Sequence, residues 1–235
     1  MALTKKPVTG MKDILPNEMI LRDDISDEIA ENAIHIQNAS KMLLALINDI
    51  LDFSKIESGK MILVKENYHL ADMLYNVINM IELKSRQKGL QFEIEVDEML
   101  PKCLYGDETR VNQVIINILN NAVKYTKEGK VRLKVSGEEI VTGEIMLCIQ
   151  VEDTGIGIRE EDQSKLFDKF ERFDLETNRN IEGTGLGLAI TYHLIQQMEG
   201  EIIVESVYGK GSTFIVYLPQ IIKEREPIGN ISILH

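Results

Sequence analysis

Apolar residues repeat every seven positions between residues 25 and 59. The first set of such positions is Ile29, Ile36, Leu43 and Ile50. The positions three residues after each of these are Asn32, Ala39, Leu46 and Phe53. This heptad pattern, interrupted by one polar residue, is typical of a helix whose apolar stripe packs against another helix. It predicts one long helix that ends near Gly59, and it favours a coiled-coil or four-helix dimer stalk over a buried core helix.

Residues 60–219 show the mixed pattern of an α+β domain. The predicted strands lie within residues 61–70 and at residues 90–96, 130–140, 143–153, 201–207 and 212–218. The predicted helices run from about residue 70 to Lys88, from 107 to 126 with Asp107 as N-cap, and from 186 to 198 with Gly200 closing the helix. A polar segment covers residues 159–183. This order predicts hairpin-paired strands with helices on one face of the sheet.

The two ends of the chain lack such patterns. Pro7, Gly10 and Pro16 interrupt any helix in residues 1–24, so we expect an irregular leader there. Residues 220–235 show no convincing periodicity and are expected to be a tail. The sequence therefore predicts four parts: a leader at 1–24, a dimerisation helix at 25–59, a folded domain at 60–219 and this tail.

Composition excludes several functions. The formal charge is -12, so the surface should repel nucleic acid and anionic lipid. The two cysteines, Cys103 and Cys148, form no CxxC pair, and a reducing compartment fits best. There is no apolar run of about 18 residues and no signal peptide. We therefore expect a cytoplasmic chain that does not insert into a membrane, although a longer parent protein could be membrane-anchored.

Three glycine clusters are candidates for a nucleotide site. They are DTGIGI at residues 153–158, GTGLGL at 183–188 and GKGSTF at 209–214. Glycine lets the backbone approach a ligand closely, and a glycine-rich turn that opens a helix offers free N–H groups to phosphate. The clusters match neither a Walker A loop nor a Rossmann fingerprint.

The helix at 107–126 adds polar side chains. Asn117 and Asn121 are four residues apart and share one face, and Lys124 and Tyr125 follow one turn later. Two amides and a lysine on one face suit a magnesium-bound polyphosphate. A solvated polar face is the alternative that the helix alone leaves open.

Together these motifs resemble the ATP-binding domain of sensor histidine kinases. The asparagine box is NILNNAVKYT, the glycine boxes are DTGIGI and GTGLGL, and the phenylalanine box is FDKFERF. The GKGST turn completes the set, in the family's order and spacing, and the resemblance runs from about residue 25 to 219. It implies a Bergerat-type two-layer α/β sandwich with a mixed sheet, and it implies ATP and Mg²⁺ as ligands.

The resemblance also implies roles for individual residues. Asp153 would accept a hydrogen bond from the adenine amine, Gly155 and Gly157 would let the backbone pass close to the base, and Thr213 would support adenine through water. Asn121 would bind magnesium with help from Asn117, Lys124 would approach the phosphates, and Tyr125 the ribose or phosphates. Residues 174–184 would form a mobile lid. The hinge and phosphate-binding end of this lid would comprise Gly183, Thr184, Gly185, Leu186 and Gly187. Phe167, Phe170 and Phe173 would pack under that lid, and Arg172 and Arg179 would be either phosphate contacts or solvated charges.

Asn117 bears on the reaction type. Gyrase, MutL and Hsp90 share the fold, hydrolyse ATP and carry a glutamate at this position. A carboxylate can act as a general base for water, whereas an amide cannot. The resemblance therefore implies phosphoryl transfer to a protein side chain, with Asn117, Asn121 and Lys124 as the catalytic residues.

The phosphoacceptor of the family is missing. Residues 25–59 match the second helix of the kinase dimerisation domain, but no box resembling SHExRTPL precedes them and His35 is the first histidine of the chain. His35 is followed by Ile36 rather than an acid, so we interpret it as structural. The expected partners are a histidine-bearing dimerisation domain in trans, a response-regulator receiver domain and, in a homodimer, a second copy. The alternative is a non-catalytic ATP-binding dimerisation or regulatory module.

The leader shows a second resemblance. Residues 3–22, with the element GMKDILP, resemble the extreme N-terminus of a histidyl-tRNA synthetase. The segment contains none of that enzyme's catalytic motifs, and the acidic charge disfavours tRNA. We therefore interpret it as a fused, recombined or engineered leader without aminoacylation activity.

Overall fold

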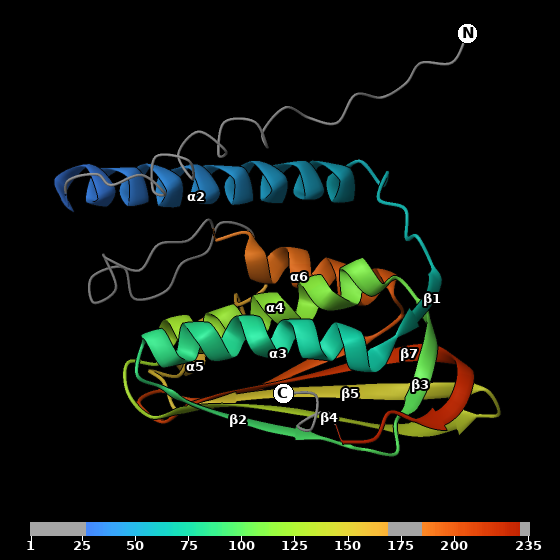
Figure 1. The fold of residues 1–235 in the computed structure, drawn as a ribbon. Coiled ribbons are helices and arrows are strands. Elements are labelled where there is room, and N and C mark those ends of the chain that lie inside the picture. The colour runs from blue at the N-terminus through green and yellow to red at the C-terminus, as the bar shows by residue number, and fades with distance from the viewer. Residues whose placement is uncertain (1–26, 169–184, 231–235) are drawn as a thin grey trace, which may run out of the picture. The chain divides into compact units, whose positions relative to one another are not determined.

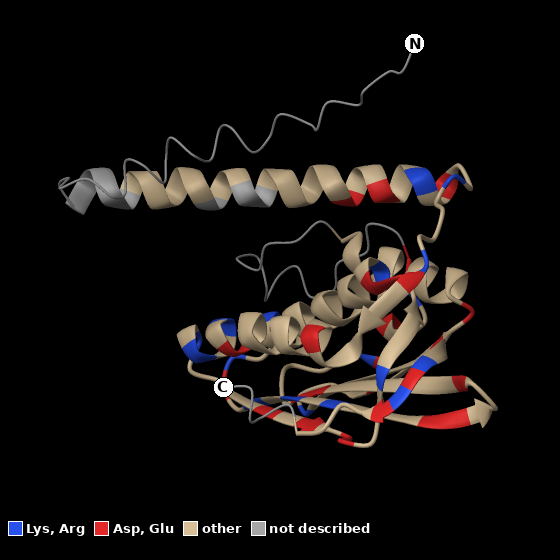
Figure 2. Cartoon of the chain, turned by 45° about the vertical axis from the view of Figure 1, so that its right-hand side comes forward, with Lys and Arg blue, Asp and Glu red and all other residues tan. Residues whose placement is uncertain are grey.

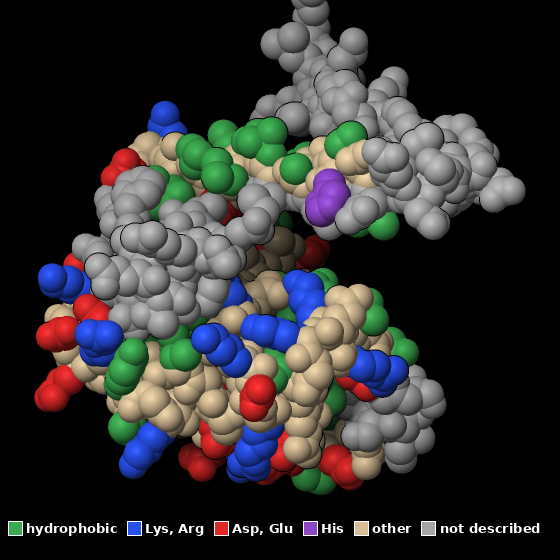
Figure 3. All heavy atoms as spheres, turned by 90° about the vertical axis from the view of Figure 1, so that its left-hand side faces the viewer, with side chains coloured by type: hydrophobic (Ala, Val, Ile, Leu, Met, Phe, Trp, Pro, Cys, Tyr) green, Lys and Arg blue, Asp and Glu red, His purple; other side chains and the backbone are tan. Residues whose placement is uncertain are grey.

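The computed structural model describes residues 27–168 and 185–230, and the chain divides into two compact units, Met1–Glu57 and Ser58–His235 (Figure 1). The first unit contains the helix α2, Asp27–Glu57, which confirms the single long helix that the heptad pattern predicts. Apolar side chains gather along this helix (Figure 3). The exposed ones are Ile34, Ile36, Leu43, Leu44, Leu46, Ile47, Ile50 and Leu51.

The second unit contains the mixed α+β domain. Its helices are α3 (Leu70–Gln87), α4 (Glu108–Tyr125), the short α5 (Glu160–Gln163) and α6 (Gly187–Gln197). Its strands are β1 (Glu66–His69), β2 (Gln91–Val96), β3 (Pro101–Gly106), β4 (Lys130–Val141), β5 (Glu144–Asp153), β6 (Glu201–Val207) and β7 (Gly211–Pro227).

The strands form one mixed sheet. The order is β1-β3-β7-β5-β4-β2, and β6 pairs with β7. β2 and β4 are parallel, whereas the other pairs are antiparallel, including the predicted hairpins β4–β5 and β6–β7. Helices α3, α4 and α6 lie on one face of this sheet, which gives two layers (Figure 1). The predicted Bergerat-type sandwich with a mixed sheet is confirmed.

The core lies between the helices and the sheet because side chains alternate along the strands. Every second residue of β5, and of β4 as far as Val135, is buried, as Leu133, Leu147 and Ile149 show with exposures of 0%. Ile81 of α3 and Ile118 of α4 face them from the helix layer. Burying one such side chain contributes about 1.5–3 kcal/mol.

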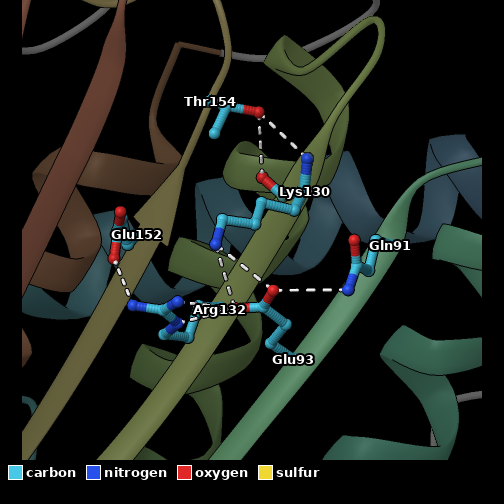
Figure 4. A network of polar contacts seen from close by, with 6 residues as sticks. All are labelled: Gln91, Glu93, Lys130, Arg132, Glu152 and Thr154. Atoms are coloured by element: carbon cyan, nitrogen blue, oxygen red, sulfur yellow. Dashed lines mark hydrogen bonds and ion pairs between the residues drawn. The ribbon is translucent and has the colours of Figure 1, made fainter.

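The opposite face of the sheet is polar. Glu93 of β2 forms ion pairs with Lys130 at 3.2 Å and Arg132 at 2.7 Å, and Arg132 reaches Glu152 of β5 at 3.2 Å (Figure 4). Acidic residues are spread over the strands (Figure 2). Hydrogen bonds from Arg132 and then Lys130 hold the pKa of Glu93 below its usual range. This charged face is therefore a solvated surface, and the site must be sought in the helix layer.

Two sequence predictions about the elements need correction. The expected tail is wrong for residues 220–227, because β7 continues to Pro227 and pairs with β3, an unpredicted strand. The domain boundary at 219 therefore cuts a strand. The first strand, β1, lies within residues 61–70 as predicted.

The end of α6 confirms that Gly200 closes the helix. Gly200 N donates to the carbonyl oxygen of Ile195 at 2.9 Å, and Glu199, with φ at 60°, takes the left-handed conformation just before it. A Cβ on Gly200 would lie 2.4 Å from the carbonyl oxygen of Tyr217. Gly200 is therefore also required by the close approach of β7.

Candidate ATP-binding site

Helix α4 positions the polar side chains of the site. Asp107 is its N-cap, as predicted, and accepts a hydrogen bond from the backbone N–H of Arg110 at 3.1 Å. The other carboxylate oxygen of Asp107 accepts from Val64 N at 2.8 Å, which anchors the preceding loop. The apolar face of α4 is buried in the core, so the face that carries Asn117 and Asn121 is only half-buried.

Asn117 joins α4 to the start of α6. Its Nδ2 donates to Oγ1 of Thr191 at 2.6 Å. A Cβ on Gly187, the first residue of α6, would lie 2.8 Å from Oδ1 of Asn117. A Cβ at residue 187 would force the Asn117 amide or α6 to shift, so glycine lets the N-terminus of α6 come this close to Asn117. The first N–H groups of α6 have no partner within the helix.

The other end of α4 contacts the DTGIGI turn. The carbonyl oxygen of Tyr125 accepts from Ile156 N at 3.3 Å, and a Cβ on Gly155 would lie 2.5 Å from that oxygen. Nζ of Lys124 lies 4.8 Å from the centroid of the Tyr125 ring. Asn121 is one helical turn from both Asn117 and Tyr125. It therefore lies between the contact with α6 and the contact with the turn.

Asp153 ends β5 on the buried face of the sheet and is 7% exposed. Burial raises the pKa of this carboxyl to about 6, against the opposing effect of backbone N–H groups of Gly155 and Ser212. The N–H of Gly155 donates to Oδ1 at 2.8 Å. A buried carboxylate stabilised only by neutral donors retains acceptor capacity, and an amine donor from a ligand would stabilise its charged form.

The structure places Thr213 on the face of the sheet opposite to Asp153. Thr213 pairs with Glu152 and Glu205, on the charged face of the sheet. Ser212 pairs with Asp153, and its side chain is buried on the same face. Side chains alternate along β7, where Phe214, Val216 and Leu218 are buried, and this alternation places Ser212 on the buried face. The same alternation is visible in the sequence and could have identified Ser212.

The turns around Asp153 fit together closely. A Cβ on Gly157, with φ at 66°, would lie 2.1 Å from the carbonyl oxygen of Val207. A Cβ on Gly211, with φ at 116°, would lie 1.9 Å from the carbonyl oxygen of Asp153. Both glycines are therefore required by conformation and by space, and they hold the DTGIGI turn against the β6–β7 turn.

Some predicted residues lie outside the described ranges. These are Gly183, Thr184, Phe170, Phe173, Arg172 and Arg179, together with the lid expected at 174–184. Of their neighbours, Gly185 has φ at 71°, Leu186 is buried, and the ring of Phe167 stacks on Tyr192 of α6 with centroids 5.0 Å apart.

Basic side chains gather where α3 and α4 end (Figure 3). Lys84 and Arg86 lie in the last turn of α3, and Lys124 in the last turn of α4. Nζ of Lys88, just beyond α3, donates to the carbonyl oxygens of Val123 at 2.6 Å and Lys124 at 2.7 Å. Lys88 was not among the predicted site residues, yet it caps the end of α4 that carries Lys124.

Known proteins show the family to which this domain belongs. Residues 106–222 match the family of histidine kinase-, DNA gyrase B- and HSP90-like ATPases. The autoinducer 2 sensor kinase/phosphatase LuxQ of Vibrio vulnificus is 39% identical over 215 residues, which cover 90% of this chain and 25% of LuxQ. The histidine-protein kinase BarA of Escherichia coli is 36% identical over 196 residues, which cover 83% of this chain and 21% of BarA.

Solved structures of histidine kinases are similar to this chain. Full-length ShkA in complex with AMPPNP superposes with a TM-score of 0.71 and 25% identity, over 92% of this chain and 45% of ShkA. The Acinetobacter baumannii histidine kinase AdeS shares the fold, with a TM-score of 0.61, 23% identity, and coverage of 89% of this chain and 94% of AdeS.

Residues 106–222 therefore belong to this ATPase family, and the chain is the ATP-binding catalytic portion of a sensor histidine kinase. It spans about a quarter of the length of LuxQ and less of BarA. Within the described residues, no helix combines the length and the apolar character needed to cross a membrane.

Proposed function

We propose that this chain binds ATP with Mg²⁺ and transfers the γ-phosphate to a histidine on another protein. The observation that carries the proposal is the pair of contacts at the two ends of one helical face. Asn117 meets Gly187 at one end, and Tyr125 meets Ile156 at the other. A nucleotide with its base at Asp153 and its phosphates at the start of α6 would therefore lie along Asn117, Asn121 and Lys124.

Adenine recognition would rest on Asp153. Its carboxylate can accept a hydrogen bond from the exocyclic amine of adenine, whereas guanine presents a carbonyl at that position and would repel it. Burial strengthens this discrimination, because a desolvated carboxylate left without a donor is costly. In the protein without nucleotide, the same desolvation of the carboxylate raises the pKa of Asp153.

The phosphates would be held by positive charge and backbone donors. The N-terminus of α6 offers N–H groups and the positive end of the helix dipole, and Lys124 offers an ammonium group. Among the described residues no group of three His, Cys, Asp or Glu side chains could hold a metal ion. The amide oxygen of Asn121 fits Mg²⁺, which prefers oxygen ligands and commonly keeps several waters and phosphate oxygens. Bound there, the ion would neutralise phosphate charge.

The site favours transfer over hydrolysis. Asn117 replaces the glutamate that would activate water, and its amide is engaged with Thr191. An amide has no basic lone pair at neutral pH, so the residues here can orient ATP but not deprotonate water. Phosphoryl transfer depends chiefly on positioning and charge stabilisation, which this arrangement supplies.

The acceptor would come from another chain. His35 is exposed on α2 and is followed by Ile36, without the neighbouring acid that the family uses. We therefore propose a histidine-bearing dimerisation domain as phosphate acceptor and a receiver domain as the next carrier. The exposed apolar stripe of α2 would contact a dimerisation helix of the acceptor or of a second copy.

Radiolabelled ATP tests the proposal. The chain is incubated with labelled ATP, Mg²⁺ and a dimerisation domain that carries the acceptor histidine, taken from a kinase such as BarA. We expect an acid-labile, base-stable phosphate on the partner, lost with Asn121→Ala and with EDTA, and none on the chain alone. ATP binding without transfer would instead support the non-catalytic regulatory module.

His35 has its own control. Label on the isolated chain that disappears in His35→Gln would identify His35 as the acceptor and overturn that part of the proposal. We expect the label on the partner to be unchanged in His35→Gln, because the proposal assigns no acceptor role to His35.

A further inference from the structure

Ser206 lies at the end of a row of three residues that crosses the sheet to Asp153. Ser206 of β6 pairs with Ser212 of β7, and Ser212 pairs with Asp153 of β5. The side chain of Ser206 is half-buried, and it points to the same face as Asp153 because both neighbours in β6 are exposed. Ser206 is thus two strands away from the carboxylate that would read the base.

The hydroxyl of Ser206 makes every hydrogen bond that a hydroxyl can make. Oγ accepts from Ile158 N at 2.8 Å, contacts Oγ of Ser212 at 3.0 Å and reaches the carbonyl oxygen of Gly211 at 3.1 Å. A hydroxyl has one proton and two lone pairs. The carbonyl of Gly211 can only accept, so Ser206 donates its proton there and accepts from both Ile158 and Ser212.

This assignment fixes the direction of the neighbouring hydroxyl. Ser212 must donate to Ser206, so its own lone pairs remain able to accept a hydrogen bond from water or from the base. Ser206 therefore sets the direction in which the Ser212 hydroxyl donates.

Ser206 also ties together two turns that surround Asp153. Ile158 closes the DTGIGI turn, and Gly211 opens β7. The backbone supports the same junction, because Gly209 N donates to the carbonyl oxygen of Ile156 at 2.7 Å. From α5, Nε2 of Gln163 donates to the carbonyl oxygen of Ser206 at 3.0 Å. The Ser206 side chain bonds to both turns at once.

We propose that Ser206 is a positioning residue for adenine selectivity, acting through Ser212 and the DTGIGI turn without touching the nucleotide. The inference rests on the proposed reading of adenine by Asp153. Loss of the Ser206 hydroxyl leaves the N–H of Ile158 without its acceptor and frees the Ser212 hydroxyl to rotate. Asp153 then meets a less ordered turn, and discrimination between ATP and GTP declines.

Calorimetric titration of Ser206→Ala with ATP and GTP tests this. We expect ATP affinity to fall about tenfold, because the binding of adenine loses stabilisation equal to about one hydrogen bond. GTP affinity should change little, because guanine does not use this stabilisation. Ser206→Cys is nearly isosteric but a weak acceptor, so it should reproduce the loss, and Ser206→Thr should restore selectivity. Ser136→Ala, on the charged face of β4, is the control and should match wild type.

Equal losses for ATP and GTP in Ser206→Ala would show a merely structural role and overturn the inference. So would unchanged selectivity in the alanine and cysteine variants. The Asp153→Asn variant distinguishes a wrong role for Ser206 from a wrong assignment of Asp153 as the residue that binds adenine. If wild type prefers ATP and Asp153→Asn abolishes the preference while Ser206→Ala keeps it, only the role of Ser206 is wrong. If wild type shows no preference, the reading of adenine by Asp153 is wrong.

Discussion

Asn117 and Thr191 link α4 and α6, the two helices that frame the phosphate end of the proposed site. Nδ2 of Asn117 donates to Oγ1 of Thr191 at 2.6 Å, and Thr191 is 1% exposed. This bond orients the amide and connects the middle of α4 to α6. A single buried hydroxyl therefore sets the direction of a side chain that would contact the nucleotide.

Thr191→Val should uncouple this link with little change in shape. The amide of Asn117 loses its buried acceptor, which costs about 1–3 kcal/mol of folding stability. MgATP affinity should fall as well, because Asn117 is free to rotate. Urea denaturation and calorimetry measure the two effects. Thr191→Ser keeps the acceptor and should stay near wild type, and a valine variant that matches wild type in both assays would show that the bond positions nothing.

Gly187→Ala should weaken phosphate binding selectively. The added Cβ would lie 2.8 Å from Oδ1 of Asn117, so α6 or the amide must shift. Helix propensity alone would favour alanine by about 1 kcal/mol, so any loss of function is due to the contact. Comparison of ATP with adenosine by calorimetry isolates the phosphate contribution. An equal fall in affinity for both ligands would place the damage at the base instead.

Sequence patterns predicted the parts of this fold that depend on local periodicity. Alternation identified β4, β5 and β6, and spacing by three and four residues identified α4. The asparagines of α4 and the carboxylate at the end of β5 were identified because their motifs are contiguous in sequence. These predictions hold in the folded chain because the spacing of apolar residues within each element determines which of its faces is buried.

The elements and contacts that the sequence patterns did not predict depend on pairing between segments that are far apart in the sequence. β3, with the sequence PKCLYG, begins with proline and ends with glycine, and it is a strand because β1 and β7 flank it. Residues 220–227 are polar at their end, yet they continue β7, and Arg225 binds Glu139 at 2.7 Å. Ser212 was overlooked in favour of Thr213 although alternation was sufficient to choose between them. Lys88 gave no local signal, because its acceptors lie more than 30 residues away in sequence.

Lys88→Met should destabilise the end of α4 that carries Lys124. The ammonium group satisfies the carbonyls of Val123 and Lys124 and lies favourably at the negative end of the helix dipole. We expect a loss of about 1 kcal/mol of stability and weaker ATP binding. Lys84→Met is a matched control, since Nζ of Lys84 donates to the side chain of Asn120 rather than to the helix end. Equal effects of the two variants would indicate lost charge rather than lost capping.

Asp153→Asn should make the free protein more stable at neutral pH. Burial raises the pKa of Asp153 from 3.8 to about 6, so the folded state holds its proton more tightly than the unfolded state. Stability from this group is therefore complete below the unfolded pKa and is lost as pH rises through the folded pKa. Asparagine does not ionise, so the variant should gain about 2 kcal/mol on wild type between about pH 4.5 and pH 8. Denaturant titrations across this range measure the gain.

The same substitution should reduce ATP affinity and remove its dependence on this carboxyl. Wild-type affinity should fall as pH drops through about 6, because the protonated acid loses the charge that strengthens the bond to the adenine amine. Asp153→Asn should bind about 10–100-fold more weakly at pH 8. Any pH dependence left in the variant belongs to ATP itself, so it serves as the control. If wild type and variant give parallel pH profiles, Asp153 does not bind the base, and the buried carboxylate is only a structural cost to the fold.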